Sequence, residues 1–265
     1  MKQMKILAIS HACVVDEYRS KFEMMTNDQN IDLKLMVPER SIEGFPVINP
    51  VPVISKSYSI VKEQTFFSKK IYMHFYPFLP FSFFRDNFDL IYIEEEPWSL
   101  AATEIIFLNQ LNKNKVPVVF FTWQNLINPW KSSSLKKIFY RHIEQITLSK
   151  FNAAIAGSVE AAHVLRKKRF KGLIRVIPQF GIDPNRFQRL PVQNMADKLI
   201  LKKPVIGFIG RLIPEKGIFI LLEAFRKIKQ ECSLLVIGNG ASAVDFKRYI
   251  SKHGLGNKIH WIPSV

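Results

Sequence analysis

Residues 204–217 constrain the fold of this chain more than any other stretch. They begin with a short apolar run at 205–209, which is typical of a parallel strand buried on both faces. Gly210 follows this run, and a glycine lets the backbone turn sharply at the end of a strand. Arg211 and Lys216 then precede an apolar run with helical spacing. The stretch therefore predicts a strand, a glycine turn and a helix, which is the repeating unit of an α/β fold.

The same stretch predicts a binding site for an anion. A helix N-terminus attracts negative charge through its unpaired N–H groups and its dipole. Arg211 and Lys216 flank the predicted start of the helix, so a phosphate or a diphosphate is the ligand that fits. The alternative interpretation is an ordinary turn that carries two solvated charges.

Strand-like and helix-like runs alternate along the rest of the chain, which favours an α/β fold with parallel sheets. We predict two Rossmann-like domains, at residues 1–187 and 204–265, joined by a polar linker at 188–203. The second domain holds only half the elements of a doubly wound domain, so we expect it to be incomplete. The predicted strands are 5–10, 31–37, 90–93, 116–122, 152–156, 175–177, 205–209, 234–237 and 258–262, and the predicted helices are 19–25, 100–111, 135–148, 159–167, 217–228 and 244–252.

The net charge of +16 lies entirely in the second half of the chain. Residues 1–132 hold 14 Lys and Arg against 14 Asp and Glu, whereas residues 133–265 hold 24 against 8. Such a basic half attracts phosphorylated ligands or an anionic membrane surface, and its densest part can equally be a solvated helix end. Nucleic acid is not expected as a partner, because no recognition motif of the usual kinds is present. The densest part consists of Arg166, Lys167, Lys168, Arg169 and Lys171.

Several classes of protein are disfavoured by what the sequence lacks. Its two cysteines and six histidines show no metal-ligand spacing, so no bound metal is expected. No secretory signal and no apolar run of spanning length are recognised, which predicts a cytoplasmic protein, with a peripheral place at the inner face of the cell membrane as an option. A dehydrogenase is disfavoured, because the dinucleotide-like glycines Gly238 and Gly240 do not follow the first strand of their domain.

Polar side chains follow three predicted strands of the first domain. His11 follows the first strand, Glu96 ends a glutamate run after 90–93, and Trp123, Gln124 and Asn125 follow 116–122. Because α/β proteins bind ligands at the carboxyl ends of their strands, these residues are candidates for one side of a cleft. The alternative for the glutamate run is a charged loop. An aromatic segment at 66–84 is interpreted as core packing, with a lipid-facing surface as the alternative.

These motifs together resemble the group 1, or family four, glycosyltransferases. The resemblance rests first on the motif Gly210-Arg211-Leu212-x-x-Glu215-Lys216-Gly217 and on the later run Leu235-Val236-Ile237-Gly238-x-Gly240. Looser matches in the first half are Glu94-Glu95-Glu96-Pro97-Trp98, Thr122-Trp123-Gln124-Asn125 and Pro178-Gln179-Phe180-Gly181. The resemblance implies GT-B architecture, which places two Rossmann-like domains around a cleft.

The resemblance also implies an activity and roles for residues. It implies a retaining transferase that uses a nucleotide-diphosphate sugar as donor substrate, needs no cofactor, and acts on a glycan or lipid-linked acceptor in cell-surface polysaccharide assembly. Arg211 and Lys216 would bind the donor diphosphate and stabilise its growing negative charge. Gly210, Gly238 and Gly240 would belong to the same donor site. The acceptor-side candidates are His11, Glu96, Trp123, Gln124 and Asn125.

The sequence departs from the family pattern at three places. No glycine-rich turn follows the first strand, and Gln124 stands near a strand end where many members carry a histidine. A pair of glutamates that grips the donor sugar in the family is not reached before Val265. We therefore expect the 265-residue chain to lack transferase activity. The alternatives are an inactive truncated remnant of such an enzyme and a basic protein that binds membrane surfaces.

Overall fold

The computed structural model describes residues 3–39, 42, 57–79, 83, 86–127, 134–185, 187–188, 199 and 201–263. The chain divides into two compact units, Met1–Ile182 and Asp183–Val265, and each is described here by itself. The boundary between the units falls close to the predicted end of the first domain at residue 187. Most of the predicted linker lies outside the described residues.

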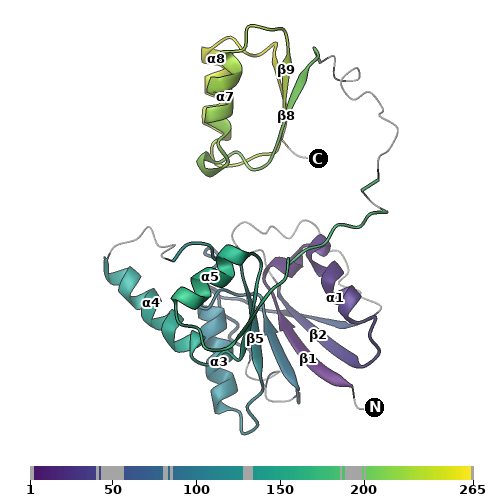
Figure 1. Ribbon diagram of the computed structural model, residues 1–265, viewed down its shortest axis with the longest axis vertical. Coiled ribbons are helices and arrows are strands. Elements are labelled where there is room, and N and C mark those ends of the chain that lie inside the picture. Colours follow the sequence, from purple (N-terminus) through teal and green to yellow (C-terminus); the bar gives the residue numbers. More distant parts are fainter. Residues whose placement is uncertain are drawn as a thin grey trace. The chain divides into compact units, whose positions relative to one another are not determined.

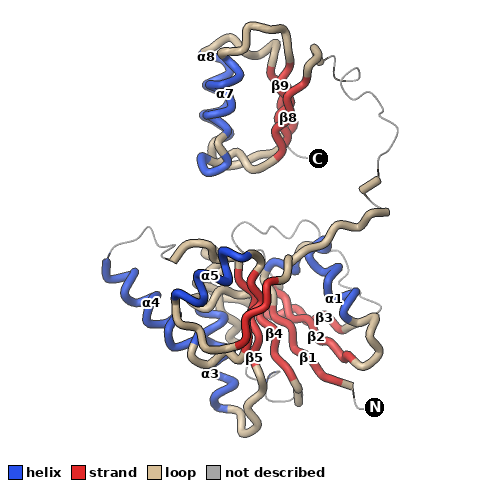
Figure 2. The backbone as a smooth tube through the Cα atoms, viewed as in Figure 1, coloured by secondary structure: helices blue, strands red, loops and turns tan. Residues whose placement is uncertain are grey.

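The first unit is built on one seven-stranded parallel sheet (Figure 2). Its spatial order is β3-β2-β1-β4-β5-β6-β7. Strands therefore grow outward in both directions from the neighbours β1 and β4, as in a doubly wound sheet. The predicted α/β fold with parallel sheets is confirmed. The strands are β1 (Met4–Ile9), β2 (Ile31–Pro38), β3 (Ser59–Glu63), β4 (Leu90–Ile93), β5 (Val118–Thr122), β6 (Ala153–Ala156) and β7 (Leu173–Val176).

Helices cover both faces of this sheet, because successive side chains of a strand point to opposite faces. Ile6 and Ala8 of β1 pack in one cluster with Phe22 of α1 (Ser20–Met25). Leu7 and Ile9 pack in the opposite cluster with buried residues of α3 (Leu100–Leu111), α4 (Ser134–Leu148) and α5 (Val159–Lys167). Figure 1 shows α1 apart from the group formed by α3, α4 and α5.

Serine caps set the starts of two of these helices. The hydroxyl of Ser99 accepts a hydrogen bond from the amide of Ala102 at 3.1 Å, and that of Ser158 accepts one from Ala161 at 3.2 Å. Both caps satisfy an amide that a helix start leaves unpaired. The predicted bounds of α3 and α5 are confirmed to the residue. The predicted helix at 19–25 is instead a 3₁₀ turn at Asp16–Arg19 followed by the shorter α1.

The second unit holds a three-stranded parallel sheet with two helices. Its strands β8 (Val205–Ile209), β9 (Ser233–Ile237) and β10 (Ile259–Ile262) lie in the order β10-β9-β8. The helices α7 (Ile218–Arg226) and α8 (Ala243–Lys252) lie on the same face of the sheet (Figure 1). Both pack in one core cluster with the inward side chains of the strands. On the opposite face Ile209 is 81% exposed.

The helices of the described part are all too short or too polar to cross a membrane.

Candidate active site

In the second unit, backbone hydrogen bonds join the loop after β8 to the loop after β9. The amide of Gly210 donates to the carbonyl of Ile237 at 3.0 Å, and the amide of Leu212 donates to that of Asn239 at 2.9 Å. A Cβ at Gly238 would overlap the carbonyl oxygen of Gly210, and a Cβ at Gly240 would overlap that of Leu212. Both glycines are thus required for this close approach. Their contact with a donor stays a prediction.

The loop after β8 leads into the N-terminus of α7. Gly217 adopts a left-handed conformation, with φ of 71°, directly after the 3₁₀ turn Pro214–Lys216. The amide of Leu221 donates to the carbonyl of Gly217, so the amides before Leu221 have no partner within the helix. The start of α7 therefore presents polarised N–H groups to any anion placed there.

Two exposed cations accompany this helix start, as predicted. Arg211 precedes the 3₁₀ turn and Lys216 ends it, and both side chains are exposed. Neither forms an ion pair with another described residue. Their charges are consequently not neutralised by the described part of the unit, which suits a phosphorylated ligand. Their roles in binding and catalysis stay predictions.

The first unit gathers ionisable side chains at the carboxyl ends of β1 and β4. These strands are neighbours in the sheet, so His11 and the glutamates at 94–96 lie at one edge. The amide of His11 donates to Glu95 Oε1 at 3.1 Å, and His11 Nδ1 lies 2.7 Å from the same oxygen. The predicted candidate His11 is thereby held by Glu95, the middle residue of the glutamate run.

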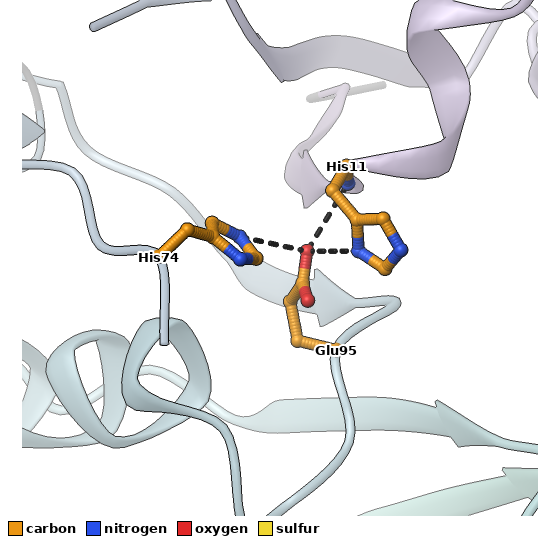
Figure 3. A group of neighbouring side chains, drawn as sticks. All are labelled: His11, His74 and Glu95. Atoms are coloured by element: carbon orange, nitrogen blue, oxygen red, sulfur yellow. Dashed lines mark hydrogen bonds and ion pairs between the residues drawn. The ribbon is translucent and has the colours of Figure 1, made fainter. Parts of the chain in front are cut away.

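A third side chain, His74, reaches this pair from the segment between β3 and β4 (Figure 3). His74 is fully buried, and its Nε2 lies 3.6 Å from Glu95 Oε1. Burial opposes ionisation of Glu95, yet the charges of His11 and His74 and the hydrogen bonds from His11 lower its pKa to about 2. Glu95 is therefore a carboxylate at neutral pH.

Glu96 turns away from this group towards the end of β5. Thr122 Oγ1 donates to Glu96 Oε2 at 2.7 Å, and the amide of Trp123 donates to Oε1 at 3.2 Å. Burial raises the pKa of Glu96 to about 7, although these two hydrogen bonds favour the charged form. Two neighbouring glutamates thus differ in protonation at neutral pH. Such a difference is what acid and base roles in one site require.

The three predicted candidates after β5, Trp123, Gln124 and Asn125, have different surroundings. The indole N–H of Trp123 donates to Gln179 Oε1 at 2.5 Å, and its ring lies against Gly157. Gln124 donates from its side-chain amide to the carbonyl of Leu126 at 3.1 Å, within its own loop. Asn125 is exposed. The structure thus brings Glu96 and Trp123 together and joins Gln124 to its own loop.

Glu94 is the centre of a second set of contacts at the same edge. Lys21 Nζ lies 2.5 Å from its Oε1, and the hydroxyl of Tyr92 donates to that oxygen at 2.9 Å. Gln179 also donates to it, at 3.2 Å. The ring of Phe180 lies beside the Lys21 ammonium and is stacked on Tyr18. The thiol of Cys13 also donates to Glu94 Oε2, at 3.6 Å, so Glu94 is compensated by one cation and three donors.

Sequence reasoning missed four members of this edge: His74, Lys21, Glu94 and Glu95. The glutamate run was recognised, but only Glu96 was chosen from it. His74 lies among aromatic residues that were interpreted as core packing. No local spacing links it to His11 or Glu95, which lie 63 residues before it and 21 residues after it.

The basic cluster lies at the C-terminal end of α5. Arg166, Lys167, Arg169 and Lys171 are exposed, whereas Lys168 turns inward and its Nζ lies 2.6 Å from Glu144 Oε1. A pocket of about 480 Å³ beside it is lined by Arg141, Lys167, Lys168 and Arg169 together with Glu144. Four cations are thus available to an anionic surface, and contact with a membrane stays a prediction.

Comparison with protein families confirms the resemblance to the group 1 glycosyltransferases. Residues 193–265 match the family described as "Glycosyl transferases group 1". Glycogen synthase 2 of Nitrosococcus oceani is 27% identical over 60% of this chain and 33% of its own length. The phosphatidylinositol N-acetylglucosaminyltransferase GPI3 subunit of Saccharomyces cerevisiae is 23% identical over 68% of this chain and 40% of its own length. The chain thus spans about a third to two fifths of these relatives.

Solved structures confirm the GT-B type of fold. Sucrose-phosphate synthase from Thermosynechococcus elongatus superposes with a TM-score of 0.72 at 18% identity, over 99% of this chain and 71% of that chain. Anabaena Alr3699/HepE, solved in complex with UDP, superposes with a TM-score of 0.69 at 14% identity, over 99% of this chain and 70% of that chain. At these identities the likeness is one of fold.

Proposed function

We propose that the protein is a glycosyltransferase that takes a sugar from a nucleotide-diphosphate donor. One observation carries the proposal: two exposed cations, Arg211 and Lys216, lie in the loop that leads from β8 to the N-terminus of α7, in the segment that matches the group 1 family. The nucleotide sugar is the donor substrate, and we propose that the transfer itself needs no cofactor. A neighbour in fold was solved with UDP, which makes UDP the natural probe.

The proposed chemistry follows from where charge develops. As the bond between the sugar and the diphosphate breaks, negative charge grows on the leaving diphosphate. Fixed cations and oriented amides stabilise that charge more in the transition state than in the bound donor, so they raise the rate. Arg211, Lys216 and the first amides of α7 are the groups assigned to this task. Loss of one such donor costs about 3 kcal/mol of barrier in comparable sites.

We assign the edge formed by His11, Glu96 and Trp123 to the acceptor. An exposed indole beside polar side chains offers a flat surface for a sugar ring, and Trp123 is 48% exposed. A Glu96 whose pKa lies near 7 can give or take a proton at physiological pH. Retention of configuration, a glycan or lipid-linked acceptor and a role in cell-surface polysaccharide assembly are proposed from the family resemblance. The proposed location is cytoplasmic, at the inner face of the cell membrane.

Titration of the intact chain with UDP in a calorimeter tests the donor site. We expect one UDP per chain, and a dissociation constant raised about 10- to 100-fold by Arg211→Ala or Lys216→Ala, because a hydrogen bond to a charged group contributes about 1.5–3 kcal/mol. Lys229→Ala is the matched control, since Lys229 is also an exposed cation of the second unit. Equal affinities for the wild type and both site variants would overturn the assignment.

A second candidate function is binding to an anionic membrane without catalysis. The four exposed cations at the end of α5 favour it. Vesicles of phosphatidylcholine with added phosphatidylserine should then sediment the protein, and Lys167→Glu with Arg169→Glu should abolish this at low salt. Lys113→Glu, at another exposed position of the first unit, is the control. Sedimentation of the double variant at the wild-type level would remove the membrane proposal and leave the donor site untouched.

A further inference from the structure

We propose that His11, His74 and Glu95 form a binding site for one divalent transition-metal ion of the zinc type. Each residue offers one ligand atom, and these three atoms all lie within 4.8 Å of one another (Figure 3). Two imidazole nitrogens and one carboxylate oxygen are the ligand set of many zinc sites that keep a position open for water or substrate. The proposal departs from the sequence-based expectation of no metal, because only the fold brings the three residues together.

The hydrogen bonding of His74 leaves one of its ring nitrogens to face the cluster. Its Nδ1 lies 2.5 Å from the carbonyl oxygen of Ile71. A carbonyl only accepts, so Nδ1 carries a proton and donates it. Nε2 is then the nitrogen that faces Glu95, and a metal ion bound there would displace any proton that Nε2 carries. Nε2 is buried and has no hydrogen-bond partner among the described residues. A metal-bound histidine is usually fixed in this way, by its other ring nitrogen on a carbonyl or carboxylate.

The distance between His74 and Glu95 is closer to that between two ligands of one metal ion than to a hydrogen-bond distance. A charge-assisted hydrogen bond brings nitrogen and oxygen to about 2.7–2.9 Å. Two ligand atoms about 2.1 Å from a tetrahedral zinc ion are about 3.4 Å apart. His74 Nε2 and Glu95 Oε1 are 3.6 Å apart. The two atoms are thus spaced like ligands that share an ion.

His11 completes the site with a small movement. Its Nδ1 lies 2.7 Å from Glu95 Oε1 and must move away by about 0.7 Å to reach the spacing of zinc ligands. His11 is partly exposed, with 12% of its side chain accessible, whereas His74 and Glu95 are buried. Solvent therefore reaches the cluster on the His11 side.

The three ligands stand on well-supported segments. His11 and Glu95 follow β1 and β4, which pair directly. The segment that carries His74 is closed by an antiparallel bridge between Phe66 and Phe75. It is also bound to α3, because the amide of Tyr76 donates to Glu104 Oε2 at 2.8 Å. Ligands held by a packed scaffold keep the geometry that a metal ion needs.

Cobalt(II) is the probe for this site, because it takes the place of zinc and absorbs visible light. Tag-free, EDTA-treated protein is dialysed and titrated with CoCl₂. We expect one equivalent of cobalt to produce a d–d absorption band between about 500 and 650 nm. ZnCl₂ should remove this band and MgCl₂ should not, because nitrogen ligands favour the softer ion. A strong thiolate band in the near ultraviolet would assign the metal to a cysteine and overturn the ligand set.

Ligand variants decide whether the band belongs to this cluster. Loss of an outer-shell partner alone costs about 10- to 100-fold in metal affinity, so Glu95→Gln, His11→Ala and His74→Ala should each weaken cobalt binding at least tenfold. His163→Ala, an exposed histidine on α5, should bind as the wild type does. If His74→Ala fails to fold, the variants at His11 and Glu95 decide. Absence of the band at 1:1 saturation, or its persistence in those variants, would overturn the proposal. UDP binding does not depend on this site, so either proposal can fail alone.

Discussion

At the scale of single residues, two neighbouring glutamates of the first unit differ in pKa because their surroundings differ. Glu95 lies between two histidines and ionises easily, with a pKa of about 2. Glu96 is one position along and has a pKa near 7, because burial outweighs its two hydrogen bonds. A sequence with three successive glutamates cannot reveal this division. The difference in pKa depends on contacts with residues that lie far away in the sequence, such as His11 for Glu95 and Thr122 for Glu96.

Glu104 of α3 provides a test of the same physics away from the glutamate run. Burial raises its pKa from 4.5 to about 7. The folded state therefore binds more protons than the unfolded state between these two values, and stability falls as the pH rises through that window. Glu104→Gln removes the titration. We expect the wild type to lose about 1–2 kcal/mol relative to this variant between pH 4.5 and pH 7, because partial exposure of the carboxylate weakens the effect of burial.

Urea unfolding of both proteins at several pH values measures this difference. Glu63→Gln, which makes the same substitution in β3 of the same unit, is the control. A stability difference between wild type and Glu104→Gln that stays constant from pH 4.5 to pH 7 would contradict the assigned burial.

At the scale of elements, α7 joins the packing of the second unit to its proposed chemistry. Its inner side chains, such as Leu222, are fully buried, whereas Ile220 on its outer side is 77% exposed. The helix that presents its N-terminus to an anion is thus anchored by its other residues. If the anchoring is lost, the position of the N-terminus is lost with it.

The two isomeric side chains on α7 form a matched pair for measurement. Leu222→Ala should lower the free energy of unfolding by about 2–5 kcal/mol, because it leaves a cavity in the core. Ile220→Ala, in the same helix, should change it by about 0.5 kcal/mol or less, because the side chain is mostly in water. Similar losses for both variants in chemical denaturation would show that α7 does not pack as described.

Most elements of both units could be predicted from the sequence, since apolar periodicity and caps are local signals. The runs at 90–93, 100–111 and 205–209 match β4, α3 and β8. The predicted start of the short helix α1 is less accurate, because a 3₁₀ turn precedes the helix and no side chain caps it. The turn from β8 into α7 could also be predicted, because Gly210, Arg211, Lys216 and Gly217 lie in one short stretch. Its role as a donor site stays a prediction.

The site in the first unit could be predicted only in part. His11 and the glutamate run follow predicted strands, so the rule for carboxyl ends of parallel strands found them. His74 could not be found, because a fold contact over 21 residues to Glu95 leaves no spacing in the sequence. The glycines Gly238 and Gly240 were assigned to the donor, whereas the structure gives each of them a packing role as well.

At the scale of the whole molecule, charge and family resemblance point to the same half of the chain. The excess of positive charge lies in residues 133–265, and the family match lies in residues 193–265. A basic field raises the local concentration of a diphosphate ligand, and its effect weakens with salt. The specific part of binding must still come from the few groups at the start of α7.

The most direct measurement of the central claim is a map of amide chemical shifts while UDP is titrated into the ¹⁵N-labelled chain. We predict that the largest changes fall in Gly210–Gly217 and in the first turn of α7, with smaller ones at Gly238 and Gly240. Arg211→Ala should reduce these changes at equal UDP concentration, and Lys229→Ala should not. Changes confined to the basic end of α5, or no changes at millimolar UDP, would contradict the claim that residues 210–217 bind the donor diphosphate.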